Sequence, residues 1–212
     1  MKLIGMLDSP FVRRVAVTML HQGFAYEHLN WSVGPDFARI LEFSPLGRVP
    51  TLVLDDGETL TESAAILDYL DELAGPAKAL LPAAGAGRRR ALRLMSYAIG
   101  AAEKGREQIY ERVMRPAELR HEPWVERCRS QMHGALGLLE TECQQRGAGA
   151  WLVGVALSQA DISLTCAYTF LLESLDLAAL ADNYPGVAAL AARCEALPEF
   201  RTTHTPWFSP GT

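Results

Sequence analysis

The stretch that decides the fold runs from residue 44 to residue 63 and reads Ser44-Pro45-Leu46-Gly47-Arg48-Val49-Pro50-Thr51-Leu52-Val53-Leu54-Asp55-Asp56-Gly57-Glu58-Thr59-Leu60-Thr61-Glu62-Ser63. A proline stands directly before a run of β-forming residues, and Asp55-Asp56-Gly57 is a hairpin signal because glycine adopts positive φ readily. Glu62 and Ser63 then open a segment with helical periodicity. This order predicts a hairpin followed by a helix, with a backbone held open beside the helix N-terminus in a geometry suited to gripping a small peptide.

The residues before this stretch predict two more strands and two more helices. Residues 2–7 are short and apolar enough for a first strand, and Ser9-Pro10 opens a helix through about residue 22, since proline suits the first helical position. Residues 25–31 alternate like a strand, and residues 36–43 form a short helical piece. The resulting order, β-α-β-α-β-β-α, indicates an α/β unit.

The remainder of the chain is helical by pattern. Helices are expected at residues 88–115, 124–146, 158–173 and 187–196. The fold class is therefore α/β plus all-α, with an α/β domain at 1–76, a linker at 77–87 and an all-helical domain at 88–212. Ser158 and Asp161 have the spacing of a capping box, which assigns Asp161 to stability rather than to catalysis.

Composition excludes several classes of protein. The chain has 212 residues, of which 49% are hydrophobic and 21% charged, as in ordinary globular proteins. No apolar run reaches the roughly 18 residues of a membrane span, and Asp8, Arg13 and Arg14 interrupt any secretion signal. Residues 1–76 carry five basic against eleven acidic side chains, which argues against a nucleic-acid partner.

The four cysteines, at positions 128, 143, 166 and 194, show neither CxxC nor metal-ligand spacing. The expectation is a cytoplasmic protein with reduced, buried thiols and no metal. Redox chemistry would need a thiol from outside the chain.

Pro50 has two interpretations. A trans proline at a strand edge is the more common case. A cis Val49-Pro50 bond would instead point the Val49 amide and carbonyl outward, where an extended peptide pairs with them like an added strand. Position in the sequence does not choose between them.

Two hydroxyl-bearing helix starts also have two interpretations each. Glu62-Ser63 suits a cap that complements the helix dipole, or a carboxylate site with Glu62 holding the ammonium of an amino-acid head group. Ser9 suits a cap, or a donor to a thiolate. A hydrogen bond to a charged group is worth roughly 1.5–3 kcal/mol and would lower the pKa of a bound thiol by about one to two units.

Taken together, Ser9-Pro10-Phe11-Val12-Arg13, the 44–50 segment and Glu62-Ser63, in this order of elements, resemble the cytosolic glutathione transferases over essentially the whole chain. The resemblance is greatest to bacterial members with a serine at the end of the first strand. It implies a thioredoxin-like N-terminal domain, a homodimer and glutathione as co-substrate. The sequence departs from the family pattern at Asp8, where a Ser or Tyr is common, and an acidic neighbour of Ser9 is expected to face solvent or pair with Arg13.

The resemblance also implies roles for individual residues. Ser9 would stabilise the glutathione thiolate, and the Val49 backbone before cis-Pro50 would pair with the cysteinyl part. Glu62 and Ser63 would take the γ-glutamyl head, and Arg48 the glycyl carboxylate.

A small apolar electrophile would bind between the domains, walled by Leu7, by Phe11, which also belongs to the glutathione-binding group, and by the helix after Arg88. The leading function is conjugation of glutathione to that electrophile. The alternatives are other glutathione-dependent chemistry (isomerisation, dehalogenation or peroxide reduction) and a non-catalytic, transferase-like binding or regulatory protein.

Overall fold

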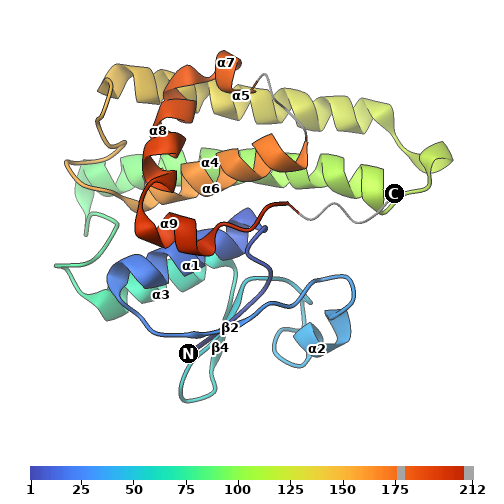
Figure 1. Cartoon of the computed structure of the whole chain (residues 1–212), viewed down its shortest axis with the longest axis horizontal. Helices are drawn as coiled ribbons and strands as arrows, with labels where there is room; N and C mark the ends of the chain where they lie inside the picture. The colour runs from blue at the N-terminus through green and yellow to red at the C-terminus, as the bar shows by residue number, and fades with distance from the viewer. Residues whose placement is uncertain (176–179, 208–212) are drawn as a thin grey trace. The chain divides into compact units, whose positions relative to one another are not determined.

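The computed structural model describes residues 1–175 and 180–207. The chain forms two compact units. One unit contains Met1–Ala83 together with Leu197–Thr205, and the other contains Ala84–Ala196 and the segment that begins at Pro206. Each unit is described by itself below (Figure 1).

The first unit is built on a four-stranded mixed sheet in the order β2-β1-β3-β4. Its strands are β1 (Lys2–Ile4), β2 (Glu27–Leu29), β3 (Thr51–Val53) and β4 (Thr59–Thr61). β1 pairs parallel with β2 and antiparallel with β3, and β3 and β4 form the antiparallel hairpin that Asp55-Asp56-Gly57 predicts. The thioredoxin-like fold expected of this unit is present.

Four helices belong to this unit: α1 (Pro10–Gln22), α2 (Phe37–Leu41), α3 (Ser63–Ala74) and α9 (Pro198–Thr203). Of these, α9 packs against α1. In Figure 1, α1 and α3 lie side by side over one face. Ile40 of α2 forms a separate buried cluster with Ile4 and Val53, against the other face.

Glycines end the two longer helices of the first unit, α1 and α3, where the sequence predicts. Gly23 follows α1 with a φ of 84°, and its N–H bonds to carbonyls of the last turn. Gly75 follows α3 with a φ of 73° and does the same. Positive φ is a conformation that glycine adopts without the steric cost of a Cβ, so both helices stop there.

The second unit is helical throughout its described part. It contains α4 (Gly85–Val113), a 3₁₀ turn η1 (Ala117–Leu119), α5 (Glu122–Arg146), α6 (Gln159–Ser174), α7 (Leu180–Asn183) and α8 (Pro185–Glu195). Nearly every residue of α6 is buried, which makes it the core helix of the unit. No helix in the described ranges is long and apolar enough to cross a membrane.

The capping box at the start of α6 is present. Asp161 is fully buried and accepts the N–H of Ser158 at 2.9 Å and the N–H of Leu152 at 2.9 Å. These bonds tie the preceding loop to the helix, which agrees with a structural role for Asp161.

The unit boundaries differ from those expected at 1–76, 77–87 and 88–212. Leu80 and Leu81 are buried in the first unit, because the Asp71 carboxylate accepts the N–H of each at 2.9 Å. The segment expected as a linker is therefore anchored at its start, and α4 begins at Gly85 rather than Arg88.

The second difference concerns α9, whose residues fall in the range expected for the helical domain but belong to the first unit. The side chain of Arg13 explains the placement: its Nη2 donates to the Phe200 carbonyl at 3.0 Å, and its guanidinium lies 5.9 Å from the centre of the Phe200 ring.

Candidate functional site

Three strand ends meet at one edge of the sheet, and the predicted site residues follow from that register. Ile4, the last residue of β1, pairs with Thr51, the first of β3, and Thr51 pairs with Thr61, the last of β4. The segment that leads to Ser9, the Val49-Pro50 bond and the Glu62-Ser63 pair therefore all adjoin this edge. Segments more than fifty residues apart in the sequence come together here through backbone pairing alone.

Gly5 permits the close approach of two of these segments. Its φ is +135°, and a Cβ at this position would lie 2.5 Å from Cγ2 of Val12 and 2.8 Å from Cβ of Val49. Real Cβ atoms do not approach so closely, so a side chain here would push α1 and the Val49 segment apart. The sequence analysis did not single out Gly5, although an isolated glycine at a strand end is a signal of close backbone approach.

Ser9 stands at the N-cap position of α1 with extended backbone angles, φ −73° and ψ 124°. Its side chain makes no capping hydrogen bond, so the cap interpretation of this hydroxyl is wrong. The residue is half-buried, as are its neighbours Asp8 and Phe11. An uncapped N-terminus carries partial positive charge on its free N–H groups, which favours an anion beside Ser9.

The Val49-Pro50 peptide bond is cis, the alternative that the resemblance implies. Arg48 precedes it at the surface, and its carbonyl accepts the Thr51 hydroxyl at 3.1 Å. Val49 packs against Ile4 and Val53 of the sheet.

Glu62 has a φ of 69°, the one positive φ outside glycine in the described part of the chain. Such a conformation costs of order 1–3 kcal/mol and is concentrated at functional sites. Its side chain does not cap α3. Instead Oε1 of Glu62 lies 2.6 Å from Nη1 of Arg48, with side chains 53% and 48% exposed respectively. The two residues expected to hold opposite ends of a ligand thus pair with each other.

Ser63 is the first residue of α3 and is only 3% exposed. Its Oγ accepts two hydrogen bonds from Arg14 of α1, from Nε at 3.1 Å and from Nη2 at 2.7 Å. The sequence analysis missed Arg14 as part of this site, because adjacent arginines in an amphipathic helix are typical of a solvated face. Both are buried here, Arg13 at 4% exposure and Arg14 at 2%.

Burial makes three of the four thiols unreactive. Burial raises the pKa of Cys143 and of Cys194 to about 12 and also raises the pKa of Cys128. Thiolate is the reactive form, so these cysteines are inert near neutral pH. Within the described residues, no group of three or more His, Cys, Asp or Glu side chains has the arrangement of a metal site.

A cavity of about 270 Å³ lies in the second unit, between the C-terminal end of α4 and the start of α5. It contains none of the predicted site residues, and its lining includes three arginines and two glutamates. Such a lining differs from the apolar surface expected for an electrophile.

Comparison with known proteins agrees with this fold. Residues 3–78 match the model of the glutathione S-transferase N-terminal domain, and residues 104–198 match that of the glutathione S-transferase C-terminal domain. An uncharacterised GST-like protein, YibF of Escherichia coli K12, is 33% identical over 140 residues, covering 66% of this chain and 68% of that protein.

Two solved structures extend the likeness to the whole chain. A glutathione S-transferase from Methylobacterium radiotolerans, in complex with glutathione sulfonate, superimposes with a TM-score of 0.89 at 26% identity, covering 100% of this chain and 97% of that one. A glutathione transferase family member from Pseudomonas fluorescens Pf-5, with bound glutathione, gives 0.85 at 30% identity, with coverage of 97% and 99%. With both domains of the family present in order along one chain, the protein belongs to the cytosolic glutathione S-transferase family.

Proposed function

We propose that the protein is a glutathione transferase that ionises bound glutathione at the sheet edge and conjugates it to a small apolar electrophile. The observation that supports the proposal is the Ser9 hydroxyl, which makes no capping bond at the N-terminus of α1, together with a strand register that brings the Val49-Pro50 bond and Glu62-Ser63 to the same edge of the sheet. Related structures that hold glutathione or glutathione sulfonate support the same ligand here.

The chemistry requires no nucleophile from the protein. The thiol proton of glutathione leaves to solvent, and Ser9 donates a hydrogen bond to the sulfur anion. The positive end of the α1 dipole also stabilises this anion. The sulfur then forms a bond to the electrophilic carbon, and a leaving group such as halide departs with its electron pair. Stabilisation of the thiolate and positioning supply most of the rate enhancement.

The remaining residues hold the tripeptide. The Val49 amide and carbonyl pair with the cysteinyl backbone, and Glu62 and Ser63 bind the ammonium and carboxylate of the γ-glutamyl head. Arg48 takes the glycyl carboxylate, with Phe11 alongside. The Arg48–Glu62 ion pair is half-exposed, and such pairs are worth less than about 1 kcal/mol, so the ligand can compete for both partners at little cost.

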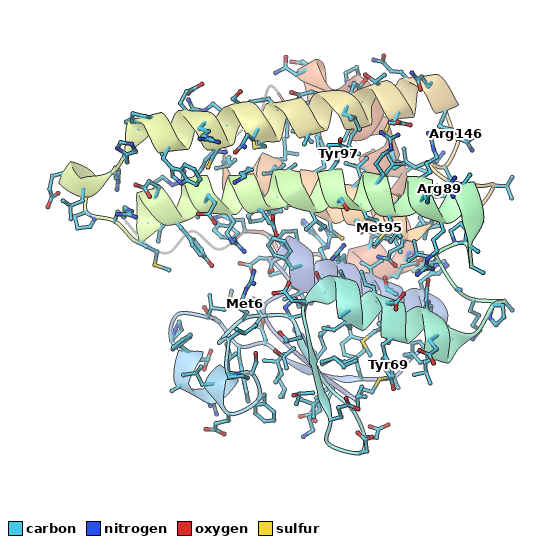
Figure 2. The ribbon with its side chains drawn as sticks, turned by 180° about the vertical axis from the view of Figure 1, so that it is seen from behind. Met6, Tyr69, Arg89, Met95, Tyr97 and Arg146 are labelled. Atoms are coloured by element: carbon cyan, nitrogen blue, oxygen red, sulfur yellow. The ribbon has the colours of Figure 1, made fainter. Side chains whose placement is uncertain are left out.

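A homodimer in the cytoplasm, with the helical unit providing the electrophile pocket, completes the proposal. Exposed apolar side chains support association in each unit separately: Leu73 on α3 of the first unit, and Leu92 and Tyr97 on α4 of the second. Figure 2 labels Tyr97 on α4 and Tyr69 on α3. Sedimentation should give a mass near twice the 23.2 kDa of one chain.

The test compares the wild type with Ser9→Ala. Calorimetry should detect glutathione binding by both, whereas kcat/KM for a model aryl halide at pH 7 should fall roughly 10-fold or more in Ser9→Ala, since the bound thiol pKa rises by about one to two units. Thr202→Ala, which removes an exposed hydroxyl from the same unit, should keep full activity. Unchanged activity in Ser9→Ala would remove that residue from catalysis.

A second candidate function is glutathione binding without turnover. It is favoured by Asp8, a half-buried acidic residue directly before Ser9, whose charge opposes a nearby thiolate if it faces the sulfur. Binding by calorimetry with no conjugation would support it. Isomerisation, dehalogenation or peroxide reduction would use the same thiolate, so a panel of substrates distinguishes those reactions from conjugation.

A further inference from the structure

The cavity of about 270 Å³ in the second unit is lined by α4, α5 and the residues that follow η1 and α6. The helices α4 and α5 pack side by side (Figure 1). Gln108, Glu111 and Met132 form the floor, with 8%, 6% and 0% of their surface exposed. Sites for drug-sized ligands commonly measure about 300–1,000 Å³, so this volume suits a smaller molecule. The cavity contains none of the residues that the proposed function uses.

The floor of the cavity requires no polar group from a ligand. Both oxygens of the Glu111 carboxylate have donors, because Oε1 accepts a backbone N–H of the α4–α5 connection at 2.9 Å and Oε2 lies 2.8 Å from Nε of Arg115. The Gln108 side-chain amide donates to a backbone carbonyl one turn earlier in α4, at 3.1 Å. The apolar part of the lining is Met132, Val125 and Leu175. The deep end therefore suits the apolar body of a ligand.

Two exposed arginines of the lining are held in place by backbone carbonyls. Nη2 of Arg112 donates to the Ser174 carbonyl at 3.0 Å, and Nη2 of Arg120 donates to the Arg112 carbonyl at 2.7 Å. Each guanidinium has five N–H groups in a rigid fork, and within the described ranges each uses one of them in these bonds. The remaining donors match the geometry of a carboxylate. Because both side chains are already ordered, a ligand loses less free energy to their ordering when it binds.

The charges around the cavity favour a ligand with a single negative charge. Two ion pairs cancel in charge: Arg115 with Glu111, and Arg129 with Glu126. Outside these pairs, the charged residues of the lining are Arg112, Arg120 and Glu122, which leaves an excess of one positive charge. A carboxylate carries one negative charge at pH 7, whereas a phosphate monoester carries about 1.5 to 2. The balance therefore favours the carboxylate.

We propose that this cavity is a second small-molecule site, which binds a monocarboxylate with its apolar body against Met132, Val125 and Leu175 and its carboxylate at Arg112 and Arg120. The site goes beyond the proposed function, because it uses no residue of the glutathione site and involves no covalent step. A ligand that binds only the folded protein also raises the melting temperature in proportion to its occupancy.

The experiment titrates the full chain with 3-phenylpropionate and follows the ligand by NMR. The wild type should bind it saturably, with a Kd of about 0.1–1 mM for a ligand of this size. The neutral twin, 3-phenylpropionamide, should bind roughly 10-fold or more weakly, because it lacks the charged hydrogen bond to a guanidinium. The third probe, 2-phenylethyl phosphate, should bind no more tightly than the carboxylate.

Three variants locate the binding. Arg120→Gln changes an exposed side chain and should raise the Kd of 3-phenylpropionate roughly 10-fold. Val125→Phe fills the cavity and should abolish saturable binding. Arg127→Gln is the matched control, because it removes the same charge from an exposed position of α5 outside the lining. It should keep the wild-type Kd.

The outcomes separate this site from the proposed function. No saturable binding by the wild type, equal binding of the acid and its amide, tighter binding of the phosphate, or an unchanged Kd in Arg120→Gln overturns the inference. Saturating glutathione should leave the Kd of 3-phenylpropionate unchanged, and displacement of the probe by glutathione would also overturn it. Glutathione binding should be the same in all three variants, so a failure at the cavity leaves the proposed function standing.

Discussion

At Glu62 the backbone adopts a positive φ that a side chain makes costly, while the carboxylate pairs with Arg48 at the surface. Glu62→Gly should remove the backbone strain of about 1–3 kcal/mol at the loss of an ion pair worth under about 1 kcal/mol. We therefore expect an unfolding free energy equal to or above that of the wild type, together with weaker glutathione binding.

Denaturant unfolding and calorimetry measure the two quantities. Glu62→Gln keeps the strained backbone and loses the charge, so it should bind weakly without any gain in stability. A destabilised Glu62→Gly would show that the side chain contributes more to the fold than its conformation costs.

The cysteines allow a second prediction for single residues. Since burial raises the pKa of Cys143 and Cys194 to about 12, almost none of either thiol is ionised at pH 8. Iodoacetamide should label both slowly in the native protein and completely in denaturant, with mass spectrometry of peptides as the measurement. Rapid native labelling at either position would contradict the burial of these thiols.

Among the helices and strands, the start of α6 allows the most specific prediction of a change in unfolding free energy. Asp161→Ala leaves the buried N–H groups of Leu152 and Ser158 without their acceptor, at about 1–3 kcal/mol each. We expect a loss of roughly 2–4 kcal/mol in unfolding free energy. Ser158→Ala keeps both of those backbone bonds and should cost only about 1 kcal/mol.

The loss of unfolding free energy caused by Asp161→Ala should depend on pH in a defined direction. Burial raises the pKa of Asp161 above its ordinary value of 3.8, so the folded state binds the proton more tightly than the unfolded chain. That contribution to stability is fully present below pH 3.8 and is lost as the pH rises through the folded pKa. The difference between wild type and Asp161→Ala should therefore be largest at acid pH, and a difference that grows toward neutrality would contradict it.

The elements show which features local sequence determines. Gly23 and Gly75 mark the ends of α1 and α3 correctly, because a helix end depends on the conformation of one residue. The first strand was expected to reach residue 7 and ends at Ile4, since Gly5 turns the chain out of the sheet. The short helices α7 and α9 were not predicted, because so few residues show no periodicity.

The candidate site shows the same contrast between features that local sequence determines and features that it does not. The order of Ser9, Val49-Pro50 and Glu62-Ser63 along the chain was sufficient to expect them in one place, because strand register brings them to one edge. The partners of those side chains were not readable. Arg14 meets Ser63 across 49 positions, and Arg48 meets Glu62, through packing that no local pattern encodes.

For the molecule as a whole, the return of α9 to the first unit links distant parts of the sequence. Phe200 is fully buried there, so Phe200→Ala should lower the unfolding free energy of that unit by about 3–5 kcal/mol. Phe37→Ala, at a half-exposed aromatic of α2 in the same unit, should cost less. Hydrogen exchange resolved by peptide identifies the unit affected, and a loss confined to residues 84–196 would contradict the assignment of α9.

This return also sets the order of events on the ribosome. Domains commonly fold from the N-terminus as the nascent chain emerges. Here the thioredoxin-like half lacks its Phe200 contact until the whole helical half has been translated, so it completes its core last although it is made first. The time needed to translate the intervening 113 residues, Ala84–Ala196, therefore separates the synthesis of the N-terminal part of the first unit from the completion of its core.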